Sequence, residues 1–287
     1  MVSVAQKTLL FTITTIFYAL TAQAQQVNNK YYNPEKLIYN VELNGISVGD
    51  ATISYTPNKQ DKTYKFFAKA ETEGFIKNIY NINDSINVYG FIKQSSFEPI
   101  NHTVKIKENS KKSHRTAFFD YKNSLIRVQN NKEKTSEDLL LLNNAKDIFS
   151  TLYELRFNTD INKINANKDT FYRTIQFAHK TVVNKITVSN PYNLTFDKKN
   201  EVKVRDVLIE SKKVRMHNIS KEQIAAIKSG ENKPEDFSEN LVKKDNYKFK
   251  QNIKVVISSD SKKIPLIIKY NTKFGTFKAT LKKYEKQ

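Results

Sequence analysis

The chain has 287 residues, a formal net charge of +19 and no cysteine. The lack of cysteine excludes a disulfide-stapled fold, a thiolate metal site, a cysteine nucleophile and a cysteine-anchored lipoprotein. A mean hydropathy of −0.60 with a single prominent apolar run excludes a polytopic membrane protein.

The N-terminus has the pattern of a secretory signal peptide. Lys7 precedes an apolar run from Leu9 to Leu20, and small residues follow at Ala22 and Ala24. The run is about a dozen residues long, whereas a membrane-spanning helix needs about 20. We therefore expect residues 1–24 to be a signal peptide cleaved after Ala24, and the mature protein to be soluble in the periplasm.

The basic charge suggests three classes of partner: nucleic acid, an anionic membrane surface or an acidic ligand. Lysine far outnumbers arginine, and the densest basic stretches, 105–115 and 243–254, alternate with polar residues as solvated surfaces do. Phosphate-reading sites favour arginine. We expect no nucleic-acid partner, while peripheral contact with an anionic membrane surface stays open.

Alternation of apolar and polar residues dominates the chain and predicts strands. In 37–43, for example, Leu37, Tyr39, Val41 and Leu43 share one face. The same period recurs at 51–55, 64–71, 86–92, 104–107, 117–121, 126–128, 171–177, 182–188, 202–208, 253–257, 264–270 and 277–281. The pattern predicts a mainly β protein with a single antiparallel curved sheet, or half-open barrel, of about a dozen strands.

Two helical segments interrupt the strands. Asp147 can cap a helix over 148–156 that is apolar over a broad arc, which suits a helix wrapped inside the curved sheet. A short helical insertion is predicted over 212–246, where Ser220 and Gln223 form a capping box. Because no linker-like stretch divides the rest, we expect one β-rich domain over 37–284, after a flexible lead-in at 25–36.

Catalytic and metal-binding signatures are weak. The four histidines are not at zinc-ligand spacing, and nucleophile-elbow, dinucleotide and P-loop motifs are absent from the sequence. We expect no metal and no cofactor. Carboxylate pairs such as Glu71 and Glu73 are explained by the wet face of a strand, although spacing alone leaves a paired-acid hydrolase open.

The predicted helix carries a row of polar groups, Asp147, Ser150, Tyr153 and Arg156, at steps of three. The row has two interpretations. It could orient a ligand, or it could consist of a helix cap, a small packing residue, a core tyrosine and a buried ion-pair arginine. We favour the second, because capping already accounts for the aspartate.

Phenylalanine and tyrosine supply all of the aromatic content, which is 11%. Rings on inward strand faces either fill a core or line an apolar cavity. If a cavity exists, the candidate ligand-lining residues are Phe66, Phe119, Phe177 and Phe277 from strands, with Leu152 and Tyr153 from the helix.

Several landmarks in one order carry a family resemblance. They are the segment 37–51, Gly74 with Tyr80 and Asp84, the helix 147–156, and the segment 256–266 followed by Gly275 and Leu281. Over about residues 37–283 the chain resembles the bacterial exported-protein family called domain of unknown function 3108. The resemblance implies a periplasmic, β-rich protein, and it transfers no catalytic residue because the family has none assigned.

These observations support three functions in order. The first is a non-enzymatic periplasmic binding or cell-envelope maintenance protein that holds an apolar, acyl-type ligand inside the curved sheet. The second is a structural or assembly factor with a filled core, which binds an envelope protein through an edge strand or the insertion. The third is an envelope hydrolase. A continuous apolar cavity would separate the first from the second.

Overall fold

The computed structural model describes residues 30–79, 81–93, 96–142, 145–158, 164, 170–177, 180–196, 200–214, 250–272 and 275–286. The predicted signal peptide, its cleavage site at Ala24 and residues 25–29 of the predicted lead-in lie outside these residues. So does the predicted helical insertion, except for its first three residues.

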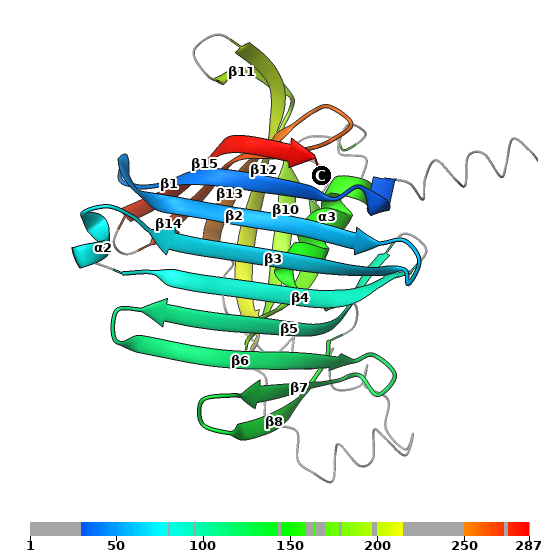
Figure 1. Ribbon diagram of the computed structural model, residues 1–287. Coiled ribbons are helices and arrows are strands. Elements are labelled where there is room, and N and C mark those ends of the chain that lie inside the picture. Colours follow the sequence, from blue (N-terminus) through cyan, green and yellow to red (C-terminus); the bar gives the residue numbers. More distant parts are fainter. Residues whose placement is uncertain are drawn as a thin grey trace, which may run out of the picture.

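One antiparallel sheet of fifteen strands makes up most of the described chain (Figure 1). The strands are β1 (Glu35–Leu43), β2 (Ile46–Asn58), β3 (Thr63–Thr72), β4 (Asn83–Lys93), β5 (Ser96–Glu108), β6 (Lys111–Asp120), β7 (Leu125–Asn130), β8 (Thr135–Leu140), β9 (Thr170–Phe177), β10 (Lys180–Val188), β11 (Tyr192–Phe196), β12 (Asn200–Val214), β13 (Lys250–Ser258), β14 (Pro265–Thr272) and β15 (Gly275–Lys286). Their order in the sheet is β8-β7-β6-β5-β4-β3-β2-β1-β15-β14-β13-β12-β10-β9, with β11 paired to β12. All of the paired strands are antiparallel, and the sheet does not close, because β8 and β9 stand at its two ends. The predicted mainly β architecture with one curved antiparallel sheet is confirmed.

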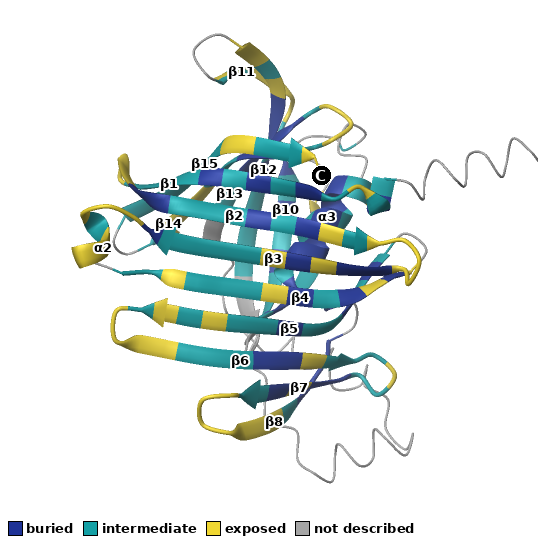
Figure 2. Ribbon diagram, viewed as in Figure 1, coloured by how far each residue is buried: buried dark blue, intermediate teal, exposed yellow. Residues whose placement is uncertain are grey.

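The sheet curls around one helix, α3 (Ile148–Asn158), as predicted. In Figure 1 the strands β1 to β8 form the near wall, β10 and β12 to β14 lie behind, and α3 lies between. The alternation seen in the sequence sets the inward face: Leu37 pairs with Ile53, and Tyr55 pairs with Phe66. All four side chains are buried. In Figure 2 each of the strands β1, β2 and β3 carries buried stretches.

The strand count exceeds the predicted dozen because β8 and β11 were not predicted. β8 has four polar residues before its buried Leu139 and Leu140, so only its end contributes to the core. β11 alternates over Tyr192, Leu194 and Phe196, but it has only five residues, three of them exposed, and it pairs with the start of β12. Backbone pairing joins the whole length of β8 to β7 and the whole length of β11 to β12.

The predicted flexible lead-in is wrong over its described part. Residues Lys30–Tyr32 form a short 3₁₀ helix, η1, and β1 begins at Glu35. Tyr31 is fully buried, and its ring lies 5.7 Å from that of Phe97. The hydroxyl of Tyr55 donates to the carbonyl oxygen of Tyr31. Aromatic burial therefore fixes this segment to the domain.

The start of the predicted insertion also needs correction, because β12 extends to Val214 and residues 212–214 are strand. A short helix, α2 (Ile76–Ile79), connects β3 to β4. Within the part of the chain that the structure describes, no helix has the length and apolarity required to cross a membrane.

Candidate functional site

Helix α3 begins with the predicted cap. Asp147 Oδ1 accepts hydrogen bonds from the backbone N–H groups of Phe149, at 2.8 Å, and Ser150, at 3.1 Å. Two of the free amides at the helix start are thereby satisfied. α3 lies within the curve of the sheet (Figure 1), and it presents different side chains to the two walls.

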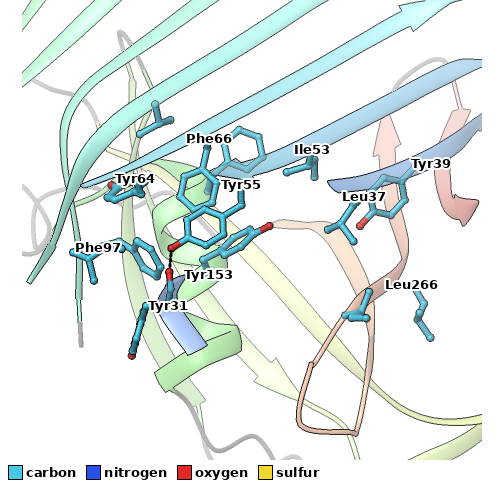
Figure 3. Close-up of a cluster of buried hydrophobic side chains, with 14 of the residues drawn as sticks. Tyr31, Leu37, Tyr39, Ile53, Tyr55, Tyr64, Phe66, Phe97, Tyr153 and Leu266 are labelled. Atoms are coloured by element: carbon cyan, nitrogen blue, oxygen red, sulfur yellow. Dashed lines mark hydrogen bonds between the residues drawn. The ribbon is translucent and has the colours of Figure 1, made fainter. Parts of the chain in front are cut away.

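The face of α3 toward the near wall packs into a cluster of aromatic rings (Figure 3). The ring of Tyr153 lies 4.5 Å from that of Phe66 and 4.9 Å from that of Tyr55, measured between centroids. Tyr64 and Phe97 belong to the same cluster, and each of these five rings is at most 1% exposed. Phe66 and Tyr153, two of the predicted ligand-lining residues, therefore fill this side of the interior.

The polar row of α3 lies on the same side and finds partners within the protein. Ser150 is hydrogen-bonded to the Tyr64 hydroxyl at 2.7 Å. Tyr153 donates to Glu35 Oε1 at 2.6 Å. Arg156 forms an ion pair with the same carboxylate and is only 2% exposed.

The Arg156 guanidinium is also bonded to the backbone. Its Nε donates to the carbonyl oxygen of Lys263 at 3.1 Å, and its Nη2 donates to that of Lys262 at 3.2 Å. Burial opposes ionisation of Glu35, yet the Arg156 guanidinium and the Tyr153 hydroxyl lower the pKa of this carboxyl below its usual value. The polar row therefore connects α3 to β1 and to the β13–β14 turn. This agrees with the second interpretation, in which the row consists of a helix cap, a packing residue, a core tyrosine and a buried ion-pair arginine.

The opposite face of α3 borders an apolar pocket of about 510 Å³. From α3 it is lined by Ile148, Phe149, Thr151, Leu152 and Leu155. Most of its opposite lining comes from β9, β10, β12, β13 and β14. Those strands contribute mainly isoleucine and valine, such as Ile186 and Ile209. We call this the interior pocket.

One polar pair lies among these apolar side chains. Ser211 of β12 donates from its Oγ to Asn184 Oδ1 of β10 at 2.6 Å, and both residues line the interior pocket. Asn184 is 2% exposed, and its Nδ2 has no hydrogen-bond partner. None of the described residues that line the pocket is charged.

The sequence analysis missed this pair. Asn184 stands between Val182 and Ile186 at the inward phase of the strand, and it is directly opposite Ser211 in the register. A polar residue at an inward position was the available signal.

The other predicted lining residues separate into two groups. Leu152 and Phe177 line the interior pocket. Phe119 instead stacks on Tyr121 at the C-terminal end of β6, with ring centroids 5.9 Å apart. Phe277 of β15 lies opposite the pocket-lining Tyr270 in the register, but it is not part of the described lining.

A second depression, of about 660 Å³, is lined in part by Arg156 and is rich in basic side chains. Lysines 30, 262, 263 and 286 line it, together with the Glu35–Arg156 ion pair and Asp260. It shares no described residue with the interior pocket. Its charge would attract anions, although its buried polar groups already bind one another.

Histidine and acidic side chains are the groups that could hold a metal ion or act as a general base. Among the described residues, no group of three or more histidine and acidic side chains is placed to hold a metal ion. His102 is fully buried in β5, neither ring nitrogen has a hydrogen-bond partner, and burial lowers the pKa of this imidazole to about 4. His179 and His217 lie outside the described residues.

Comparison with known proteins agrees with the resemblance seen in the sequence. The sequence model of a family described as "Protein of unknown function (DUF3108)" matches residues 38–282. The chain belongs to this family. The description of the DUF3108 family names no catalytic activity, and the comparison with curated proteins finds no match.

A solved structure shares the fold of the DUF3108 protein. It is the β-barrel-like protein of domain of unknown function DUF1849 from Brucella abortus, with a TM-score of 0.52 and 12% identity. The match covers 89% of this chain and 98% of the other. At this identity the likeness is one of fold alone, and it agrees with a curled sheet that resembles a barrel.

Proposed function

We propose that the DUF3108 protein is a non-enzymatic binding protein of the cell envelope that holds an apolar, acyl-type ligand in the interior pocket. The observation that carries this proposal is the pocket itself: about 510 Å³ bordered by α3 and by the strands β9, β10 and β12 to β14. Ligand pockets commonly have volumes of about 300–1,000 Å³ and mostly apolar linings.

The chemistry of the lining favours an apolar occupant over water. An ordered water needs about two to four polar partners, and apolar cavities without them stay dry. The described lining offers few such groups, mainly Asn184, Ser211 and Tyr270. Thr151 also lines the pocket, but its hydroxyl already donates to the Asp147 carbonyl oxygen at 2.8 Å.

Hydrophobic transfer can supply a useful affinity. Each buried methylene contributes about 0.8 kcal/mol. A chain of about ten methylenes would gain about 8 kcal/mol, which corresponds to a dissociation constant near 1 μM before ordering costs are subtracted. An acyl chain of ordinary length is therefore a sufficient ligand.

The periplasmic location belongs to the proposal and rests on residues 1–24. If they are a signal peptide, the exported protein begins at Gln25, and its intact mass will show this directly. Retention of residues 1–24 in the envelope fraction would make the protein membrane-anchored and would contradict a soluble periplasmic carrier.

Two measurements test ligand binding. Native mass spectrometry of the protein purified from its own periplasm, followed by solvent extraction, should show a bound lipid. Separately, the neutral fluorescent probe N-phenyl-1-naphthylamine should bind saturably to the delipidated protein. If only apoprotein is recovered and the probe does not bind, the filled-core assembly factor replaces the binding protein.

A pocket-filling variant localises the binding. Leu152→Trp places a larger side chain at the α3 border of the pocket and should reduce probe binding at least about tenfold. Phe67→Trp is the matched control, because Phe67 is 40% exposed on β3 and lies outside the described pocket lining. Equal probe binding by wild type and Leu152→Trp would show that the probe binds elsewhere.

A further inference from the structure

Asn184 gives the interior pocket a hydrogen-bond donor that the protein does not use. Its Oδ1 accepts from Ser211, while its Nδ2 has no partner although the residue is almost fully buried. Buried polar groups in folded proteins are nearly always paired, so an unpaired donor on a pocket wall points to a ligand group.

The position of the donor supports this conclusion. Val182 and Ile186, on either side of Asn184 along the inward face of β10, also line the pocket. The nearest lining residue across the sheet on β12 is Ser211, which holds the amide oxygen. The amide is therefore fixed by one bond, and its second polar group remains for a ligand.

We infer that the ligand is an acyl chain bearing an uncharged carbonyl oxygen, as in an ester, and that this oxygen accepts a hydrogen bond from Asn184 Nδ2. The inference rests on the proposed function and narrows its ligand class.

Two physical arguments select the uncharged carbonyl. A pure hydrocarbon would leave the Nδ2 donor buried and unpaired, which carries a desolvation penalty. A carboxylate would satisfy the donor, but the described lining has no cation to balance its charge, and burying an unpaired charge is far more costly. An ester oxygen avoids both penalties.

The test compares three competitors that displace N-phenyl-1-naphthylamine from the delipidated protein: methyl decanoate, decanoate and dodecane. After each affinity is corrected for the competitor's water-to-alkane partition coefficient, methyl decanoate should bind about tenfold more tightly than dodecane, the effect of one hydrogen bond to an otherwise unpaired buried donor. It should also displace the probe at lower concentration than decanoate does.

A variant assigns this preference to the residue. Asn184→Leu has a similar side-chain volume without the donor, and after the same partition correction it should bind methyl decanoate and dodecane within about twofold of each other. Ser211→Ala frees the amide oxygen and should reduce the ester preference in part. Asn87→Leu, on the exposed face of β4, is the control and should retain the full preference.

The outcomes separate the two proposals. If the probe does not bind to the wild-type protein, the binding function itself is refuted. If the probe binds but the corrected affinity of dodecane equals that of methyl decanoate, the pocket holds hydrocarbon and the role of Asn184 is refuted. If decanoate is the best competitor, the ligand is an anion. The comparison among competitors uses the wild-type protein, so poor folding of a variant does not affect it.

Discussion

The cap of α3 should make the protein less stable as the pH rises through the range from about 4 to 6. Asp147 uses Oδ1 to cap the helix, but its Oδ2 is buried without a hydrogen-bond partner. Burial raises the pKa of Asp147 to about 6, although hydrogen bonds from Ser150 and Phe149 act in the opposite direction. The ionised cap is therefore less stable in the folded protein than the protonated one.

The size of the effect follows from linkage. In unfolded chains the pKa of aspartate is about 3.9, so between about pH 4 and pH 6 the folded state binds the extra proton. This contribution to stability is complete below about pH 4 and is lost as the pH rises through about 6. A difference of about two pKa units corresponds to about 3 kcal/mol at most, because one unit is about 1.4 kcal/mol.

Asp147→Asn tests the argument, because asparagine keeps the capping oxygen without the charge. In the variant the amide nitrogen takes the place of Oδ2 and is likewise buried without a hydrogen-bond partner, which offsets part of the gain in stability. We expect the variant to be more stable than wild type by about 1–3 kcal/mol at pH 7.5, and to lose this advantage near pH 4.

Urea unfolding followed by circular dichroism from pH 4 to 8 measures the difference between variant and wild type. The acid Glu35 has the opposite behaviour, because its pKa is lowered by Arg156 despite its burial, but its contribution cancels in the difference. Asp61→Asn, in an exposed turn, is the control. A difference that stays constant with pH, or a variant less stable at pH 7.5, would refute the reasoning.

Three further substitutions probe the packing that positions the pocket. Arg156→Met leaves the Glu35 carboxylate buried without its ion-pair partner and should lower the unfolding free energy by about 3–5 kcal/mol above pH 5. The double variant Glu35→Leu/Arg156→Met should recover most of this loss, and additive losses in a double-mutant cycle would contradict a coupled pair. Phe66→Ala should cost about 3–5 kcal/mol in chemical denaturation, and a loss below 1 kcal/mol would show that the aromatic cluster is loosely packed. Gly90→Ala places a Cβ 2.3 Å from the carbonyl oxygen of Glu98 and should lower stability by about 1–3 kcal/mol, whereas an unchanged urea midpoint would mean that β5 shifts freely.

The sheet was predictable from the sequence because most of its strands alternate between one buried and one exposed face. In β1 the buried residues Leu37 and Tyr39 stand two apart, and the same period predicted thirteen strand segments. β8 was missed because its first four residues are polar, and β11 was missed because its alternating segment is only five residues long.

Long-range polar partners were not predictable. Glu35 occupies an inward position of β1, and its partner Arg156 is 121 residues away along the chain. Local pattern analysis assigns a charged residue at such a position to solvent, so residues 25–36 were predicted to be flexible. The interpretation of Arg156 as a buried ion-pair arginine agrees with the structure, but the carboxylate that pairs with it could not be named.

Only part of the candidate site was predictable, because two of the predicted lining residues, Leu152 and Phe177, border the pocket whereas Phe66 and Tyr153 fill the other side. The two sides differ in the length of the side chains on the two walls. α3 is apolar around most of its circumference, so the sequence could not distinguish the side that is filled from the side that is open. On the near wall, rings such as Tyr55 and Phe66 reach the helix and pack against Tyr153. The facing strands β10, β12 and β13 carry mainly isoleucine and valine, which are too short to close the same gap. The pocket therefore originates in the side chains of the far wall, and Leu152 borders it only because the helix turns that face toward them.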